Sequence, residues 1–156
     1  MGLLIDSLKT LPQWGNLLVI MIPDHGYLYK QSYEDPEFFH SPMLWLGGAI
    51  RQPRRMQVLM NQSDLAATLL SQLGISHRDY PWSRNVLSRK YPYPFAYGCF
   101  PAGIMWKDHT GETLFDITAN SLVTAHHAGG EERLRKAQSV LQTGYDWYSE
   151  QMHTFR

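Results

Sequence analysis

The chain has 156 residues, of which 44% are hydrophobic and 18% are charged, and this balance predicts a globular chain with a core and excludes an intrinsically disordered one. Fourteen basic and fourteen acidic side chains cancel to a formal net charge of zero, so we expect no nucleic-acid partner. Cys99 is the only cysteine, which excludes an internal disulfide and a zinc site built from cysteines.

The first half of the chain alternates helix and strand signals. Residues 2–11 carry apolar side chains at the spacing of one helix face, and Pro12 ends this pattern. Residues 17–22 form a continuous apolar run, which favours a strand covered on both faces, as in a parallel sheet with helices on each side. Residues 43–46 and 57–60 predict two further short strands. We therefore expect an α/β fold with a partial mixed sheet flanked by helices.

The clearest helix signal lies at residues 63–73. Leu65, Leu69 and Leu73 share one face, and Asp64 suits the positive end of the helix dipole. Asn61 or Ser63 is expected to cap the start, and Gly74 stands at the expected stop.

The half after residue 80 is predicted to consist of aromatic loops, a hairpin and a terminal helix. Residues 102–106 and 113–117 predict an antiparallel hairpin around a turn at 108–111. This hairpin is either an edge of the same sheet or a small subdomain. We interpret the aromatic residues between 80 and 106 as packing rather than as a ligand cage. Residues 131–152 predict a helix with one apolar face, formed by Leu134, Ala137, Leu141, Tyr145, Tyr148 and Met152.

Asp24-His25-Gly26 follows the apolar strand and is the segment whose position favours chemistry. A carboxylate and an imidazole supply the oxygen and nitrogen donors that Zn²⁺ or Mn²⁺ binds. In open α/β sheets, ligands bind beyond the carboxyl ends of strands. Two adjacent ligands do not complete a coordination sphere, so the others must come from elsewhere. The alternative is a turn that merely ends a strand.

Residues 17–26 resemble the signature of an apolar strand followed by Asp-His-Gly in the alkaline phosphatase/sulfatase superfamily. More narrowly, they resemble its lipoteichoic acid synthase-like, phosphoglycerol transferase branch. Residues 39–48 and 61–75 are similar to the strand and helix that follow in that branch. The resemblance covers nearly the whole chain and is specific from about residue 4 to residue 75. It implies that residues 1–156 are the C-terminal portion of such a catalytic domain, with a strand–helix core at 1–80 and loops, hairpin and helix at 81–156.

The resemblance also implies a mechanism. In that family a threonine, or a modified cysteine or serine, attacks phosphorus or sulfur, and divalent metal ions lower the pKa of the nucleophile and neutralise the oxyanions. The family's metal ligands after the strand correspond to Asp24 and His25, which implies a divalent metal, Mn or Zn. The nucleophile and the remaining ligands come earlier in the family's sequence and have no counterpart here. We therefore assign no catalytic residue and expect the isolated chain to bind metal weakly and to lack turnover.

Two histidine positions invite a site interpretation. His40 precedes a predicted strand, and some relatives place a site histidine after the motif, so it is our candidate for substrate binding; the alternative is an ordinary loop histidine. His126 and His127 are adjacent, and adjacent side chains diverge on a strand or a helix. We interpret this pair as surface residues.

Other candidates have simpler explanations. Ser63 and Thr68 lack a neighbouring base in the sequence, so neither is expected to be a nucleophile. Arg51, Arg54 and Arg55 suit an anionic head group, but solvated loop charge is the favoured interpretation.

The expected partners follow from the resemblance. They are the rest of the catalytic domain upstream of residue 1 and an anionic phosphate or sulfate ester. Self-association through exposed core surface is a further expectation. The resemblance places the protein at the extracytoplasmic face of a bacterial membrane or in the periplasm. Two alternatives remain: an interaction domain with a decayed metal site, and a structural subdomain that completes the sheet of a larger enzyme.

Overall fold

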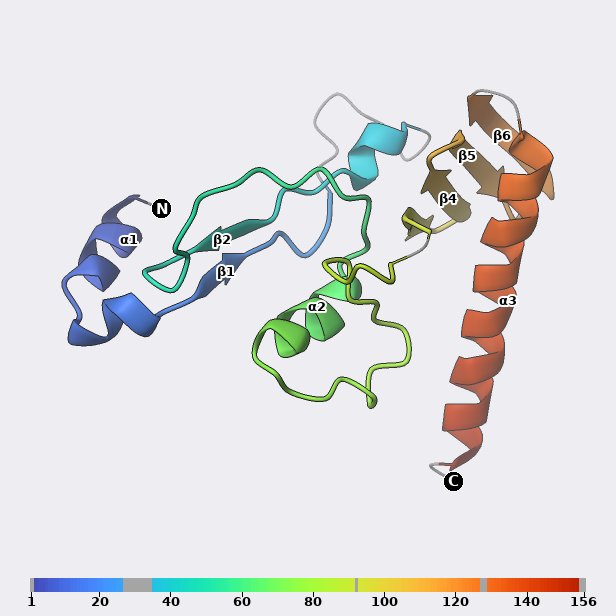
Figure 1. Cartoon of the computed structure of the whole chain (residues 1–156). Coiled ribbons are helices and arrows are strands. Elements are labelled where there is room, and N and C mark those ends of the chain that lie inside the picture. The colour runs from blue at the N-terminus through green and yellow to red at the C-terminus, as the bar shows by residue number, and fades with distance from the viewer. Residues whose placement is uncertain (1, 27–34, 92, 127–128, 155–156) are drawn as a thin grey trace. The chain divides into compact units, whose positions relative to one another are not determined.

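The computed structural model describes residues 2–26, 35–91, 93–126 and 129–154 (Figure 1). The chain divides into two compact units, one that ends at Gln57 and one that begins at Val58. Helices and two antiparallel sheets are distributed over these units, which confirms the α/β class. No helix in the described ranges combines the length and the apolarity needed to cross a bilayer.

The first unit combines short helices with a two-stranded sheet. The helix predicted near the start is confirmed, and Pro12 opens a 3-10 helix after it, a position where its missing N–H costs nothing. The elements of this unit are α1 (Gly2–Lys9), η1 (Pro12–Asn16), β1 (Val19–Met21), η2 (Pro36–Phe39) and β2 (Leu44–Leu46).

The sheet of the first unit is antiparallel, with Ile20 opposite Trp45. We expected the strand at 17–22 to be covered on both faces in parallel pairing, and this detail is wrong for the described residues: all three residues of β1 are only partly buried. A continuous apolar run predicts a buried strand, but it does not predict whether the neighbouring strand is parallel or antiparallel. Gly47 ends β2 at a φ of +121°, a left-handed conformation that glycine adopts without strain.

Among its described residues, the second unit consists of a four-stranded antiparallel sheet and two helices. The elements are α2 (Asp64–Gln72), β3 (Phe95–Phe100), β4 (Gly103–Asp108), β5 (Gly111–Asp116), β6 (Ser121–His126) and α3 (Gly130–Thr154). The strands lie in the order β3-β4-β5-β6, and the predicted hairpin forms the centre of the sheet. The hairpin thus belongs to a different sheet from β1 and β2, and the outer strands β3 and β6 were not predicted.

The strand predicted at residues 57–60 is wrong. This segment has no regular secondary structure and pairs with no strand among the described residues. One of its carbonyls, that of Leu59, accepts a hydrogen bond from the Tyr91 hydroxyl instead (3.1 Å). The three apolar residues at 58–60 fit a strand pattern, but a side-chain hydroxyl, and not a neighbouring strand, donates to the Leu59 carbonyl.

The core of the second unit lies between α3 and the sheet (Figure 1). Ile104, Trp106, Phe115 and Ala137 are buried together. The Phe95 ring stacks on Trp106 with centroids 4.5 Å apart. Tyr93, Phe95, Tyr97 and Trp106 therefore pack in or against the core, as we expected, whereas Tyr80 is exposed.

The predicted apolar face of the terminal helix is only partly correct. Ala137 is buried and Leu134 and Leu141 are partly buried, whereas Tyr145 is 65% exposed and Tyr148 and Met152 are exposed too. The helix has the expected periodicity over its whole length, but only its first half contacts strands β4 to β6 closely enough to bury side chains.

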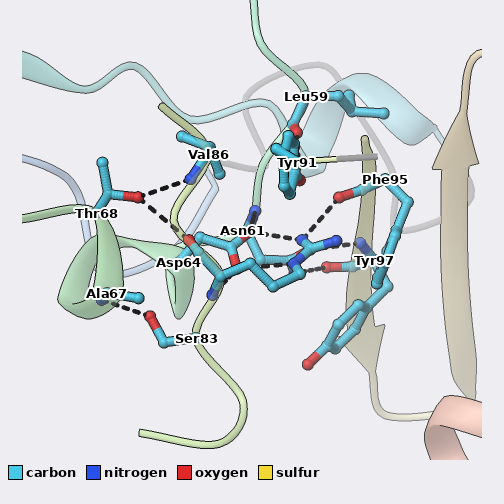
Figure 2. A network of polar contacts seen from close by, with 11 residues as sticks. Leu59, Asn61, Asp64, Ala67, Thr68, Ser83, Val86, Tyr91, Phe95 and Tyr97 are labelled. Carbon is cyan, nitrogen blue, oxygen red and sulfur yellow. Dashed lines mark hydrogen bonds and ion pairs between the residues drawn. The ribbon is translucent and has the colours of Figure 1, made fainter. Parts of the chain in front are cut away.

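The buried face of α2 also differs from the prediction. Leu73 is 58% exposed, and the buried side chains are Asp64, Ala67 and Thr68. A carboxylate can be buried here because Arg84 pairs with it side-on: Arg84 Nε lies 2.9 Å from Asp64 Oδ1 and Nη2 lies 2.5 Å from Oδ2. Figure 2 shows this network, in which the Thr68 hydroxyl also accepts a hydrogen bond from the Val86 amide (3.2 Å).

The outer edge of β3 is hydrogen-bonded by the side chain of Asn61. The Asn61 amide group donates to the Tyr97 carbonyl (2.6 Å) and accepts from the Tyr97 N–H (3.1 Å). Asn61 thereby makes the pair of hydrogen bonds that a neighbouring strand would make (Figure 2). We expected the side chain of Asn61 or Ser63 to cap the start of α2. Instead, the Asn61 backbone N–H donates to Asp64 Oδ2 (2.8 Å), and the Ser63 side chain makes no capping bond.

Candidate metal site

Asp24 and His25 follow β1 in the first unit, as the sequence predicted. Both are exposed, the Asp24 side chain to 90% and the His25 side chain to 73%. Their side chains face one another, with His25 Nε2 3.7 Å from Asp24 Oδ1. The same carboxylate oxygen also accepts a hydrogen bond from the His25 backbone N–H (3.1 Å). The pair is thus accessible and convergent.

The orientation of the His25 ring is set by the next residue. His25 Nδ1 lies 2.6 Å from the Gly26 carbonyl oxygen. A carbonyl can only accept, so Nδ1 carries a proton, and in the neutral imidazole the lone pair is then on Nε2, the atom that faces Asp24. A backbone carbonyl that fixes the tautomer in this way is a common outer partner of metal-binding histidines.

The two facing donor atoms fit one coordination sphere. Zinc binds imidazole nitrogen and carboxylate oxygen at about 2.0–2.2 Å, so two ligands at a tetrahedral angle lie about 3.4 Å apart. The 3.7 Å between His25 Nε2 and Asp24 Oδ1 is close to that spacing but longer. A small side-chain rotation would bring the two donors to the spacing of half a tetrahedral site. Within the described ranges, no group of three or more His, Cys, Asp or Glu side chains is assembled to hold an ion.

Gly26 brings this segment against η2. A Cβ added to Gly26 would lie 1.7 Å from the Phe38 carbonyl oxygen. Only glycine allows this approach, so the backbone just after the two donors rests on the helix that precedes His40.

His40 ends η2 and remains a prediction as a substrate-binding residue. Its side chain is 80% exposed, and its Nδ1 lies 3.3 Å from Glu37 Oε2. The pair is three residues apart and both partners are exposed. The contact between Gly26 and Phe38 places the η2 segment next to the Asp24-His25 segment, but the described contacts of His40 itself are with Glu37.

The remaining sequence candidates have surroundings of their own. Thr68 Oγ1 donates to the Arg84 carbonyl (3.2 Å) and is buried, which fits a structural role. Arg51, Arg54 and Arg55 are exposed, as the favoured interpretation required. The His126 side chain and all of His127 lie outside what the structure describes.

One polar cluster that the sequence did not reveal surrounds Asp108. The turn after β4 is confirmed: Asp108 Oδ1 accepts from the Thr110 N–H (2.8 Å) and hydroxyl (2.5 Å). Its Oδ2 accepts from Trp106 Nε1 (3.0 Å) and from the Tyr93 hydroxyl. Burial by itself raises the pKa of Asp108, but these hydrogen bonds outweigh it and hold the pKa well below its usual range. A saturated carboxylate of this kind stabilises the turn.

Lys136 completes this cluster. Its Nζ donates to Glu132 Oε1 (2.8 Å) and to the Tyr93 hydroxyl (2.6 Å). These two hydrogen bonds raise the pKa of Lys136 above its usual value. No local sequence pattern indicates this cluster, because its members come from three separate segments.

One of three comparisons with known proteins found a similar fold. A scan against protein-family models and a search of curated proteins found no match. Among solved structures, a protein of the alkaline phosphatase superfamily from Vibrio parahaemolyticus superposes with a TM-score of 0.73 at 20% sequence identity. The match covers 96% of this chain and 39% of that one, so the chain spans well under half the length of this structural relative. The α/β fold described above is therefore similar to part of an alkaline phosphatase superfamily protein.

Proposed function

We propose that this chain is a portion of a metal-dependent enzyme that acts on phosphate or sulfate esters, with Asp24 and His25 as two of its metal ligands. The observation that carries the proposal is the facing pair of donors, 3.7 Å apart, directly after β1. The fold similarity to an alkaline phosphatase superfamily protein supports it. The resemblance of residues 17–26 to the phosphoglycerol transferase branch supports the finer assignment within that class.

The chemistry of the site follows from the residues present. A divalent ion, Zn or Mn, would supply Lewis acidity for the nucleophile and for the oxyanions of the ester. Asp24 contributes one negative charge and His25 a neutral nitrogen, a donor set that suits either ion. The Gly26 carbonyl keeps the His25 Nε2 lone pair available on the side of Asp24. The nucleophile and the other ligands would come from protein outside this sequence.

The proposal is tested by metal binding rather than by activity. Zn²⁺ and Mn²⁺ are titrated into the 156-residue chain by calorimetry, with Asp24→Ala and His25→Ala as site variants. Asp6→Ala is the matched control, because Asp6 is an exposed carboxylate of the same unit that pairs with Lys9. We expect weak, saturable binding that each site variant weakens at least about tenfold and that the control leaves unchanged. Equal binding by all four proteins would contradict the assignment and favour an interaction domain with a decayed site.

The expected partner is the rest of the catalytic domain. If that domain supplies the missing ligands, a longer protein that includes it should bind the metal far more tightly than the isolated chain. We also propose the extracytoplasmic face of the membrane or the periplasm as its location, on the resemblance alone. Turnover of a phosphate or sulfate ester by the purified 156-residue chain would contradict the view that the nucleophile lies elsewhere.

A further inference from the structure

The second unit contains a hollow with a basic lining and an aromatic wall. Its volume is about 400 Å³. None of the described residues that line it is acidic. Its lining includes Arg84, Ser88, Lys90, Tyr91 and Phe95.

Arg84 gives this hollow an unused hydrogen-bond donor. Its Nε and Nη2 are occupied by Asp64, and Nη2 also donates to the Phe95 carbonyl (3.0 Å). Nη1 is buried and has no hydrogen-bond partner among the described residues. A buried N–H of a guanidinium without an acceptor is costly, and a ligand oxygen would relieve that cost.

The guanidinium is also held rigidly. Its central carbon lies 3.6 Å from the centroid of the Phe95 ring and 5.4 Å from that of Tyr91. The side-on pairing with Asp64 fixes its plane. The guanidinium itself therefore needs little ordering by a ligand, whereas the side chains that cover Nη1 would have to move to expose it.

The charge around the hollow favours an anion. Asp64 neutralises Arg84, and Lys90 adds a positive charge for which the structure shows no ion-pair partner among the described residues. Burial raises the pKa of Tyr91, so this phenol stays protonated and adds no negative charge. The hydroxyl of Ser88 accepts from the Lys90 N–H (3.1 Å), which leaves its own proton to donate.

We infer that this hollow is a binding site for a tetrahedral oxyanion, the phosphate or sulfate group of a free ion or of an ester. Arg84 Nη1, Lys90 Nζ and the Ser88 hydroxyl would bind its oxygens, and the ring of Tyr91 would contact an organic part. Three separate donors suit a phosphate or sulfate group, which offers three or more acceptor oxygens, better than a carboxylate, which offers two. Because Nη1 is buried, binding requires a local side-chain movement. The site is independent of the proposed metal ligands and needs no metal.

The test is a nuclear magnetic resonance titration of the ¹⁵N-labelled chain in EDTA. Inorganic phosphate and phenyl phosphate are the probes, and phenol is the uncharged control. We expect saturable shifts of the Arg84 Nε–H and of the Ser88 and Lys90 amides with both phosphates, and none with phenol. Tighter binding of phenyl phosphate would identify an ester as the ligand, and equal binding would identify the free ion.

Two charge variants separate the hollow from general surface charge. Lys90→Gln removes a lining charge, and Arg89→Gln removes an exposed charge beside it that does not line the hollow. We expect Lys90→Gln to weaken phosphate binding about fivefold, Lys90→Arg to retain it, and Arg89→Gln to change it less than about twofold. The absence of saturable shifts in the wild type, or equal losses in Lys90→Gln and Arg89→Gln, would overturn the inference. Since EDTA removes metal, neither result bears on Asp24 and His25.

Discussion

Gly26 and Phe38 are in backbone contact, close enough that a Cβ on Gly26 would lie 1.7 Å from the Phe38 carbonyl oxygen. The contact joins the segment that carries both proposed metal ligands to η2, the helix that His40 ends. The carbonyl of the same glycine lies 2.6 Å from His25 Nδ1. The glycine of the Asp-His-Gly motif therefore contacts both η2 and the proposed metal ligand.

Gly26→Ala should consequently disturb the site and the first unit together. The added methyl group cannot be accommodated without a backbone shift, and overpacking of this kind costs about 1–3 kcal/mol. We expect lower protection of the β1 and β2 amides in hydrogen exchange and weaker Zn²⁺ binding. Gly15→Ala is the matched control in the same unit, because no atom lies within 4 Å of its added Cβ. If both variants behaved alike, the Gly26–Phe38 contact would not be what orders this segment.

The sequence predicted the elements better than the contacts between them. The helix at 63–73 was predicted because its apolar spacing is local, but its buried face was not. That face includes Asp64, whose burial depends on Arg84, and no local pattern indicates a partner twenty residues away. The strand predicted at 57–60 failed for the same reason, since strand formation depends on a neighbour and Leu59 has Tyr91 instead.

The candidate site was predicted to a similar degree. The position of Asp24 and His25 follows from the apolar run and the two residue types. The direction of the His25 ring depends on a backbone carbonyl, and the approach of η2 depends on a contact twelve residues along the chain. Such details are settled by tertiary packing, which a single sequence does not reveal.

The buried pair of Asp64 and Arg84 should be essential to the stability of the second unit. Arg84→Met keeps much of the apolar stem but leaves the Asp64 carboxylate buried without a cation, which costs about 3–5 kcal/mol. Urea unfolding followed through the amides of α2 and β3 measures the loss. Arg89→Met changes an exposed neighbour and should stay within about 0.5 kcal/mol of wild type.

A double variant completes this test. In Asp64→Asn/Arg84→Met no charge remains buried, so part of the lost stability should return. A double variant as unstable as the sum of the two single variants would mean that the two side chains act independently, contrary to the pairing described.

Asp108 should make the stability of the second unit fall in acid. Its pKa in the folded protein is below the ordinary value of 3.8, so folding favours the charged form. The stabilisation is therefore complete well above pH 3.8 and is lost progressively as the pH falls below that value toward the folded pKa. Unfolding free energies of the second unit, measured at a series of pH values, should show this decline.

Asp108→Asn identifies the group responsible. At neutral pH the variant should be less stable by about 1–3 kcal/mol, because an amide cannot accept all the donors that Trp106, Tyr93 and Thr110 direct at the carboxylate. The difference from wild type should shrink as the pH falls. The exposed Asp79 supplies the control, since Asp79→Asn should leave the pH dependence unchanged. A constant difference at every pH would rule out Asp108 as the titrating group.

Asn61 should protect the edge of β3 from other strands. Asn61→Ala removes both hydrogen bonds to Tyr97 and leaves a partly buried N–H and carbonyl unpaired, a loss of about 1–3 kcal/mol. An edge with free backbone groups can pair with another chain, so we also expect more self-association in sedimentation velocity. Amide exchange at Tyr97 reports the edge directly and should accelerate. Asn61→Asp retains the acceptor for the Tyr97 N–H but loses the donor to the Tyr97 carbonyl, so its Tyr97 amide should stay better protected than in Asn61→Ala. Equal exchange at Tyr97 in wild type and Asn61→Ala would show that something other than this side chain closes the edge.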